Sequence, residues 1–341
     1  KPMKNKSENK ESRRSFLRSA GLLAGSFAIA GAGKRSSQDS GNNPPEKAAL
    51  NAAQYEFFDI HLHGSLPRHP NVKGFTSPQG LIELMDNSAT GKAVVLPIVS
   101  PEFMTTLVSP EEALQVCARD PERLIPFCNL DPRFVANSPK ANLMPLLSAY
   151  KELGCKGLGE YTVNIPLDDP LNMNLFRQVE EIGFPLTFDL APQVGGYYGC
   201  YEDQGLPRLE RVLKEFPKLI FLGHSQVFWA EIGPLYHPDE RKGYPKGPVT
   251  REGRLVELMR KYPNLHGDLS AGSGFNAISR DPEFGYKFLE EFQDRLYYGT
   301  DHAKLPFVTY FRNLKEKHLI SDTAYEKIIR KNAEKLLLGK G

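Results

Sequence analysis

Two histidines, His61 and His63, stand at the end of the first apolar run of the chain, in the stretch EFFDIHLHGS at residues 56–65. Alternate residues of a β-strand point to the same face, so both imidazoles project together, about 7 Å apart along the strand. Two imidazoles that converge on one point suit a divalent transition metal ion, zinc above all. Such a pair also arises by chance, so the prediction depends on what ends the later runs.

Charged or imidazole side chains also end four later apolar runs. They are Glu160, Asp189, His224 and Asp301. A group of this kind is costly to bury unless it is paired or bound to a metal. The three carboxylates are therefore candidates to complete a metal site with the two histidines of the first run.

Eight short apolar or β-branched runs could form the strands that position these groups. They lie at residues 56–62, 92–99, 124–130, 155–161, 185–190, 219–225, 264–270 and 296–301. Helix-like segments separate them, and two of these begin with Ser-Pro at Ser77 and Ser109, an N-cap followed by a residue suited to the first turn. Repeated strand and helix predicts a parallel sheet, either a closed barrel or an open doubly wound sheet.

The barrel is the better prediction for two reasons. No GxGxxG motif follows the first run, which weakens a dinucleotide-binding sheet. About 290 residues follow the N-terminal region, and roughly 250 are typical of a barrel. We therefore predict an α/β fold, a (β/α)8 TIM barrel with long loops at the C-terminal face of its strands, where active sites of such barrels lie.

Four stretches together resemble the amidohydrolase superfamily, and within it the amidohydrolase-related branch of metal-dependent TIM-barrel hydrolases. They are FDIHLHG, FLGHS, YGTD and the closing IIRKNAEKLLL, and the resemblance covers residues 56–338. It implies that His61 and His63 bind metal and that Asp301 binds metal and takes a proton from the bound water. It also implies that His224 binds a second metal ion or orients the substrate. Glu160 stands where many members have a bridging carboxylate or a carboxylated lysine.

The sequence departs from this family pattern at the fifth run. Many members have a histidine ligand there, whereas this chain has Asp189 in PLTFDLAP. A carboxylate is an acceptable ligand for zinc or manganese, so Asp189 is a candidate direct ligand. Alternatively, it holds a ligand histidine in place without touching the metal. The departure leaves the number of ions, one or two, and their identity open.

The first 32 residues form a separate predicted segment. They carry seven basic and two acidic residues, and without them the net charge of the chain changes from +2 to −3. Arg13-Arg14, an apolar stretch and a small-residue end resemble a twin-arginine export signal. We predict a signal peptide at 1–32, a flexible linker at 33–54 and the barrel domain at 55–341. The mature protein is then expected in the periplasm or outside the cell, without a membrane span.

Several further residues are candidates for roles around the site. Asp268 is expected to orient a ligand histidine or to hold the top of the barrel, and His302 to be packed. The long connection 226–253 is interpreted as a substrate-covering loop or as an insertion packed on the barrel. Arg68, Arg280 and Lys246 are candidates to contact an anionic substrate. The Gly/Ser-rich stretch 268–277 is a weak candidate for the same task through its backbone N–H groups.

These observations predict a hydrolase that uses a metal-activated water to cleave an amide, ester or lactone of a small carbonyl substrate. The expected cofactor is one or two divalent ions, zinc or manganese. A non-oxidative decarboxylase of a small aromatic or unsaturated acid is the first alternative, and a non-catalytic exported binding protein is the second. The expected partners are a small-molecule substrate and the twin-arginine export machinery. The charge gives no sign of a nucleic-acid surface, and the sequence does not decide whether the protein is a homo-oligomer.

Overall fold

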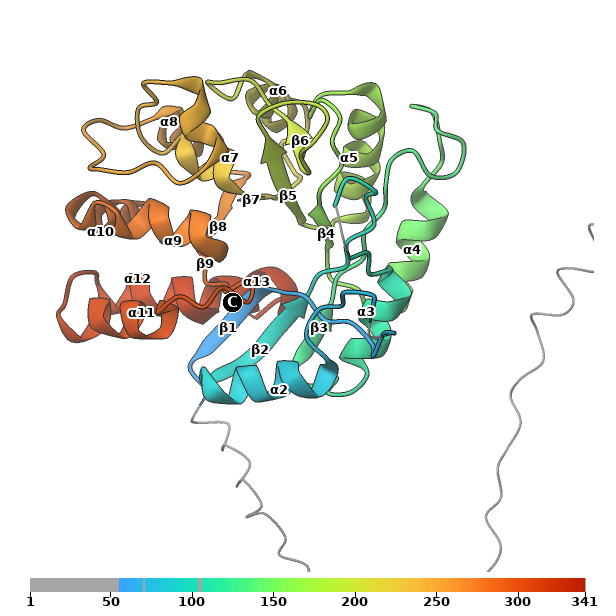
Figure 1. Ribbon diagram of the computed structural model, residues 1–341, viewed down its shortest axis with the longest axis horizontal. Coiled ribbons are helices and arrows are strands. Elements are labelled where there is room, and N and C mark those ends of the chain that lie inside the picture. Colours follow the sequence, from blue (N-terminus) through green and yellow to red (C-terminus); the bar gives the residue numbers. More distant parts are fainter. Residues whose placement is uncertain (1–54, 70, 104–105, 341) are drawn as a thin grey trace, which may run out of the picture. The chain divides into compact units, whose positions relative to one another are not determined.

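Parallel strands surrounded by helices make up the fold of the computed structural model, which describes residues 55–69, 71–103 and 106–340 (Figure 1). The predicted signal peptide and linker lie outside these residues. The strands of the barrel, in chain order, are β1 (Phe57–Leu62), β2 (Thr90–Val95), β3 (Leu124–Pro126), β4 (Leu158–Tyr161), β5 (Leu186–Ala191), β7 (Phe221–His224), β8 (Leu265–Asp268) and β9 (Leu296–Tyr297). They fall within the eight predicted runs, apart from the first two residues of β2 and the last of β5, and confirm the predicted barrel class.

Hydrogen bonds join the strands into a ring. All strand pairs are parallel, in the orders β1-β2-β3 and β4-β5-β7-β8-β9. Between β3 and β4, the N–H of Cys128 donates to the Gly157 carbonyl at 2.9 Å. Between β9 and β1, the N–H of Ile60 donates to the Tyr298 carbonyl at 3.0 Å. These two bonds close the sheet, so the C-terminal ends of all the strands meet at one face.

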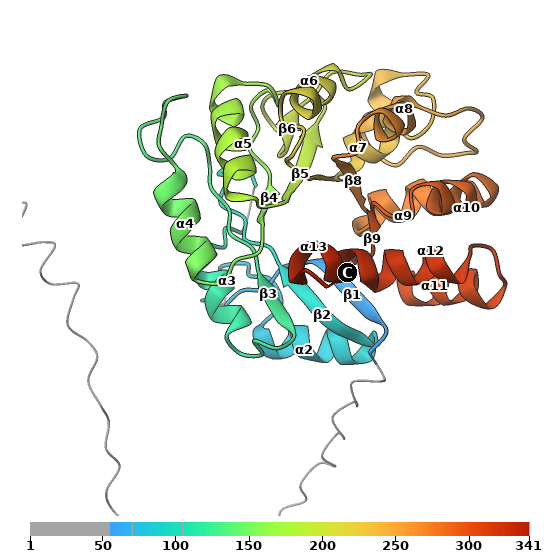
Figure 2. The ribbon, with the colours of Figure 1, turned by 180° about the vertical axis from the view of Figure 1, so that it is seen from behind.

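Helices cover the outside of this ring, as Figure 2 shows from behind. The helices include α2 (Pro78–Asn87), α3 (Pro110–Cys117), α4 (Met144–Glu152), α5 (Pro170–Ile182), α6 (Pro207–Glu215), α8 (Arg254–Lys261), α10 (Pro282–Glu291), α11 (Phe307–Glu316), α12 (Asp322–Glu326) and α13 (Asn332–Leu338), the last two joined by the π-helical turn η3 (Lys327–Lys331). Ser77 and Ser109 cap α2 and α3 through their side chains, as the Ser-Pro starts predicted. None of the helices in the described part of the chain is long and apolar enough to cross a membrane.

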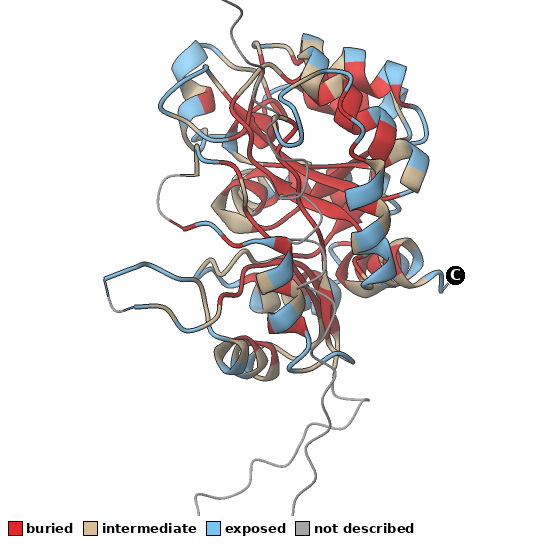
Figure 3. Ribbon diagram, turned by 90° about the vertical axis from the view of Figure 1, so that its right-hand side faces the viewer, coloured by how far each residue is buried: buried red, intermediate tan, exposed pale blue. Residues whose placement is uncertain are grey.

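Buried residues concentrate in the strands and on the inward faces of the helices (Figure 3). Leu62, which lies between His61 and His63 at the end of β1, is fully buried in a cluster that includes Leu81 and Met85 of α2. The outward leucine therefore anchors a helix while its neighbours face inward. All four cysteines are buried and free.

Two loops at the C-terminal face contain structure that the sequence did not predict. The segment after β5 contains a short strand, β6 (Cys200–Tyr201), which pairs with Leu190 and Ala191 at the end of β5. The connection after β7 contains α7 (Gln226–Ala230) and the 3-10 helix η2 (Pro238–Lys242). The Gly/Ser-rich stretch after β8 is not a loop, since most of it forms the helix α9 (Ala271–Ser279).

Candidate metal centre

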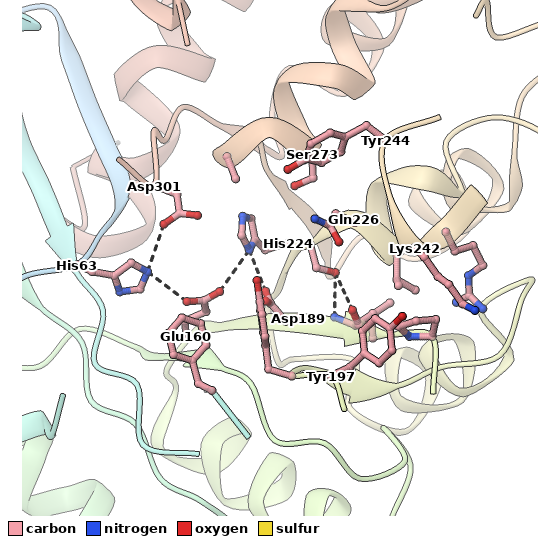
Figure 4. Close-up of a pocket in the computed structure, with 18 of the residues that line it drawn as sticks. His63, Glu160, Asp189, Tyr197, His224, Gln226, Lys242, Tyr244, Ser273 and Asp301 are labelled. Carbon is pink, nitrogen blue, oxygen red and sulfur yellow. Dashed lines mark hydrogen bonds and ion pairs between the residues drawn. The ribbon is translucent and has the colours of Figure 1, made fainter. Parts of the chain in front are cut away.

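Five strand ends place the six predicted residues at one face of the barrel. His61 lies on β1 and His63 just after it, while the acidic residues and His224 come from β4, β5, β7 and the turn after β9. Figure 4 shows His63, Glu160, Asp189, His224 and Asp301 facing a common space. The structure therefore brings together side chains that lie up to about 240 positions apart in the sequence, as a closed barrel does.

Four ligand atoms converge most closely in this space. The Nε2 atoms of His61 and His63 are 3.1 Å apart. The Oε2 atom of Glu160 lies 3.6 Å from the first and 3.2 Å from the second. The Oδ1 atom of Asp301 lies 3.8 Å from the first and 3.4 Å from the second. Ligands about 2.1 Å from a tetrahedral zinc ion are about 3.4 Å from one another. The donor set and its spacing therefore fit a divalent transition metal ion.

Hydrogen bonds fix both histidines with Nε2 toward this point. The Nδ1 atom of His61 is 2.6 Å from the Oδ2 atom of Asp268, and that of His63 is 2.9 Å from the carbonyl oxygen of Leu96. A proton on each Nδ1 leaves a lone pair on each Nε2, which is the tautomer that a metal ion needs. His302 is packed beside the site, where its Nε2 accepts the backbone N–H of His63 at 2.7 Å.

Positive φ angles in the backbone position the carboxylates of Glu160 and Asp301. Glu160 follows Gly159, whose φ of 146° favours glycine and where a Cβ atom would lie 2.7 Å from the carbonyl oxygen of Thr187 on β5. Asp301 itself has a φ of 49°, a left-handed conformation that aspartate tolerates better than most residues. Its N–H donates to the carbonyl of His61 at 2.9 Å. Strand β9 is therefore shorter than the predicted run, and Asp301 lies on the turn that follows it.

A second group of candidate ligands shares two residues with the first. It consists of His61, Glu160 and His224. Glu160 faces both groups, since its Oε1 atom is 3.5 Å from the Nδ1 atom of His224. The Nε2 atom of His224 is buried without a hydrogen-bond partner among the described residues. Glu160 is therefore placed between two potential ion positions.

Asp189 contacts His224 and belongs to neither group of candidate ligands. The two residues are register partners on β5 and β7, and the Oδ1 atom of Asp189 lies 2.8 Å from Nδ1 of His224. This arrangement favours the alternative in which Asp189 holds a histidine. Burial, followed by the neighbouring charge of Glu160, raises the pKa of Asp189 to about 7.

The carboxyl groups outnumber the imidazoles in this centre, so their negative charge needs further positive charge nearby. Four carboxyl groups, those of Glu160, Asp189, Asp268 and Asp301, surround three imidazoles. Burial lowers the pKa of His63, but its contacts with Asp301 and Glu160 raise it more, to about 9. These carboxylates thus stabilise positive charge at Nε2, whether as protons or as a bound cation.

A cavity of about 190 Å³ opens onto these groups. The segments 192–205 and 226–253 both contribute to its walls, which supports the interpretation of the second as a covering loop. Aromatic side chains make up much of the lining: Phe75, Phe103, Tyr197, Tyr198 and Tyr244. Trp229, by contrast, is buried outside the cavity and donates its Nε1–H to the Asp268 carbonyl at 2.9 Å.

The predicted anion-binding residues do not line this cavity. Arg68 is paired with Glu112 at 2.7 Å, and both Arg280 and Lys246 line a separate hollow of about 360 Å³. Arg241 and Ser273 line the cavity instead. The sequence did not single out either residue. Arg241 lies in the charged run HPDERKG, which is typical of a solvent-exposed segment, and Ser273 lies in a Gly/Ser-rich stretch.

Comparisons with known proteins agree with the fold. The sequence model of an amidohydrolase family matches residues 58–338. A comparison with curated proteins found no match.

Three solved structures are similar to this chain. An uncharacterised TIM-barrel protein of Bordetella bronchiseptica has a TM-score of 0.54 at 18% identity, over 77% of this chain and 83% of that one. A probable 2-pyrone-4,6-dicarboxylic acid hydrolase of Acinetobacter baumannii has a TM-score of 0.52 at 14% identity, over 84% and 100%. A 2,6-dihydroxybenzoate decarboxylase of Rhizobium has a TM-score of 0.52 at 17% identity, over 84% and 99%. At these identities the likeness establishes the TIM-barrel fold.

Proposed function

The chain belongs to this amidohydrolase family of enzymes, and we propose that it is a metal-dependent hydrolase of an amide, ester or lactone bond in a small carbonyl substrate. The observation that carries the proposal is the convergence of Glu160 and Asp301 on the Nε2 atoms of His61 and His63, at 3.2–3.8 Å, with the two Nε2 atoms 3.1 Å apart. A divalent ion held there, zinc or manganese, would polarise a carbonyl and lower the pKa of a water molecule.

Asp301 is the residue best placed to move a proton. Its side chain is 27% exposed toward the cavity, whereas that of Asp268 is fully buried behind His61. Burial raises the pKa of Asp301, but the adjacent His61 and His63 lower it more, so the carboxylate is ionised at neutral pH. An ionised carboxylate can accept a proton from water and deliver it to the leaving group.

In this proposal, Glu160 and His224 lie at a second position beside the first ion, where another ion or the substrate would bind. Glu160 holds the first ion and, if two are bound, bridges to the second. His224, kept in place by Asp189 at 2.8 Å, is available to bind that second ion or to orient the substrate. Its unpartnered Nε2 atom is consistent with either role.

A decarboxylase is the second candidate function, and one feature of the cavity favours it. Five aromatic side chains line the walls and would suit a flat aromatic acid. In that case the same residues would hold the ion, and no water molecule would be consumed. The similarity to the Rhizobium decarboxylase is a similarity of fold and is compatible with both candidates.

Metal content and product analysis test the proposal together. Purified protein is expected to contain about one or two zinc or manganese ions per chain, and His63→Ala to lose most of the metal. His266→Ala, which removes a buried histidine away from the cavity, is the matched control and should keep it. Water-dependent cleavage of esters or lactones supports the hydrolase, and release of carbon dioxide from aromatic acids supports the alternative. Full metal content in His63→Ala would contradict both.

We also propose that residues 1–32 direct export of the folded protein through the twin-arginine machinery to the periplasm or beyond. The proposal is supported by Arg13 and Arg14 before an apolar stretch. Replacing both arginines by lysine should retain the protein in the cytoplasm, as measured by cell fractionation. Unchanged export would contradict it.

A further inference from the structure

We propose that Arg241 and Ser273 form an anion-binding subsite in the cavity, so that the substrate carries a carboxylate at the end remote from the reacting bond. The inference rests on the proposed function and specifies its substrate class. Its basis is a pair of buried polar side chains that line the cavity and carry atoms without a hydrogen-bond partner among the described residues.

Arg241 is the stronger of the two observations. It is only 4% exposed, although an arginine is seldom buried unless several of its donors are paired. Among the described residues, its one ion pair joins Nε to the Oε1 atom of Glu231 at 3.3 Å. The Nε and Nη2 atoms have no hydrogen-bond partner among the described residues. A buried guanidinium with unused donors is costly unless a ligand pairs with it.

Ser273 adds an independent donor from another element. It lies on α9, is 3% exposed, and its hydroxyl has no partner within the described residues. Figure 4 shows Lys242 on the side of the cavity away from Asp301 and His63, with Ser273 between the two sides in this view. Arg241 lies on η2, next to Lys242, so the two unpartnered groups come from separate segments that border one cavity.

The charge distribution of the cavity gives the substrate an orientation. Glu160, Asp189 and Asp301 are matched at one end by His63, His224 and the proposed ion, whereas Arg241 and Lys242 are the arginine and the lysine of the lining and lie outside that centre. A substrate carboxylate can pair with the buried guanidinium, because an arginine binds a carboxylate through two parallel hydrogen bonds. The cavity, at about 190 Å³, is smaller than the roughly 300 Å³ at which most ligand sites begin, so the substrate is small.

Binding of benzoate, compared with the neutral isostere benzamide, tests the subsite. Affinity is measured from ligand-induced thermal stabilisation at constant ionic strength, in metal-loaded protein and again after removal of metal with a chelator. Wild type should bind benzoate better than benzamide in both states. Arg241→Gln should weaken benzoate binding about 10- to 100-fold, the worth of a charged hydrogen bond, and change benzamide binding less than about threefold.

Two further variants separate binding from folding and from general charge. Arg241→Lys retains the charge and should keep part of the preference for benzoate even if Arg241→Gln is unstable. Arg251→Gln removes an exposed arginine of the same connection and should change neither affinity.

The proposal is overturned if wild type does not prefer benzoate, or if the preference survives in both Arg241 variants at full strength. It is also overturned if the preference vanishes on metal removal, because the carboxylate would then sit on the metal. A protein that never binds metal but keeps the Arg241-dependent preference would refute the proposed hydrolase and leave this subsite standing.

Discussion

Asp268 should control the metal affinity of the centre without touching the metal. Its Oδ2 atom lies 2.6 Å from Nδ1 of His61, and its Oδ1 atom accepts the Ser270 N–H at 3.0 Å. Asn has the same shape but only one acceptor oxygen. In Asp268→Asn, the amide either keeps its oxygen toward His61 and opposes the Ser270 N–H with its NH2 group, or turns around. If it turns, the NH2 group donates to Nδ1 and moves the imidazole proton to Nε2, which blocks that metal ligand.

The expected loss follows from the strength of this bond. A hydrogen bond to a charged group contributes about 1.5–3 kcal/mol and a neutral one about 0.5–1.5 kcal/mol. Asp268→Asn should therefore lose about 1.5 kcal/mol of metal binding, or roughly tenfold in Kd. Asp268→Ala, which removes the bond altogether, should lose roughly 10- to 100-fold.

Competition for zinc with a fluorescent chelator measures these affinities. Glu202→Gln is the control, because Glu202 is equally buried but accepts backbone N–H groups at the start of α6, from Leu209 at 2.6 Å among others. It should lower the free energy of unfolding and leave the zinc Kd unchanged. The reasoning is refuted if Asp268→Asn binds zinc as tightly as wild type, or if Glu202→Gln weakens zinc binding to the same extent.

Three further predictions concern the stability of the barrel. His266 is buried, with Nδ1 2.9 Å from the Tyr297 hydroxyl, and burial lowers its pKa to about 3. Because the unfolded state takes up the proton first, stability is lost as pH falls from about 6.5 toward 3, by up to about 3 kcal/mol at pH 4. Urea unfolding at pH 7 and 4 should show a smaller acid loss in His266→Gln, and an equal loss would contradict this. Asn332→Ala should cost about 1–3 kcal/mol in the same assay, because its side chain donates to the Gln293 carbonyl at 2.7 Å and to the buried Leu296 carbonyl at 2.9 Å. A cost below about 0.5 kcal/mol would count against it. Gly223→Ala should cost about 1–3 kcal/mol, since its Cβ would lie 2.2 Å from the buried Phe228 ring. The control Gly243→Ala meets no atom within 4 Å, and equal melting temperatures for the two variants would refute the steric argument.

The strands and most of the candidate ligands could be predicted because their signals are local. Alternation along β1 places His61 and His63 on one face and Leu62 on the other, whatever the rest of the chain does. The eight runs predicted a parallel barrel, and the rule that active sites lie at the C-terminal strand ends singled out Glu160, His224 and Asp301. Their convergence needed only the closure of the sheet.

The partners of these residues were decided by the tertiary structure alone. The contact between His61 and Asp268 joins positions 207 residues apart, and that between His224 and Asp189 depends on the register of β5 with β7. Nothing in the run HPDERKG distinguishes Arg241, which is buried at the cavity, from the exposed charges beside it. The sequence determines the types of the side chains and the spacing between them. The burial and the hydrogen-bond partners of each side chain depend on which distant segments pack around it.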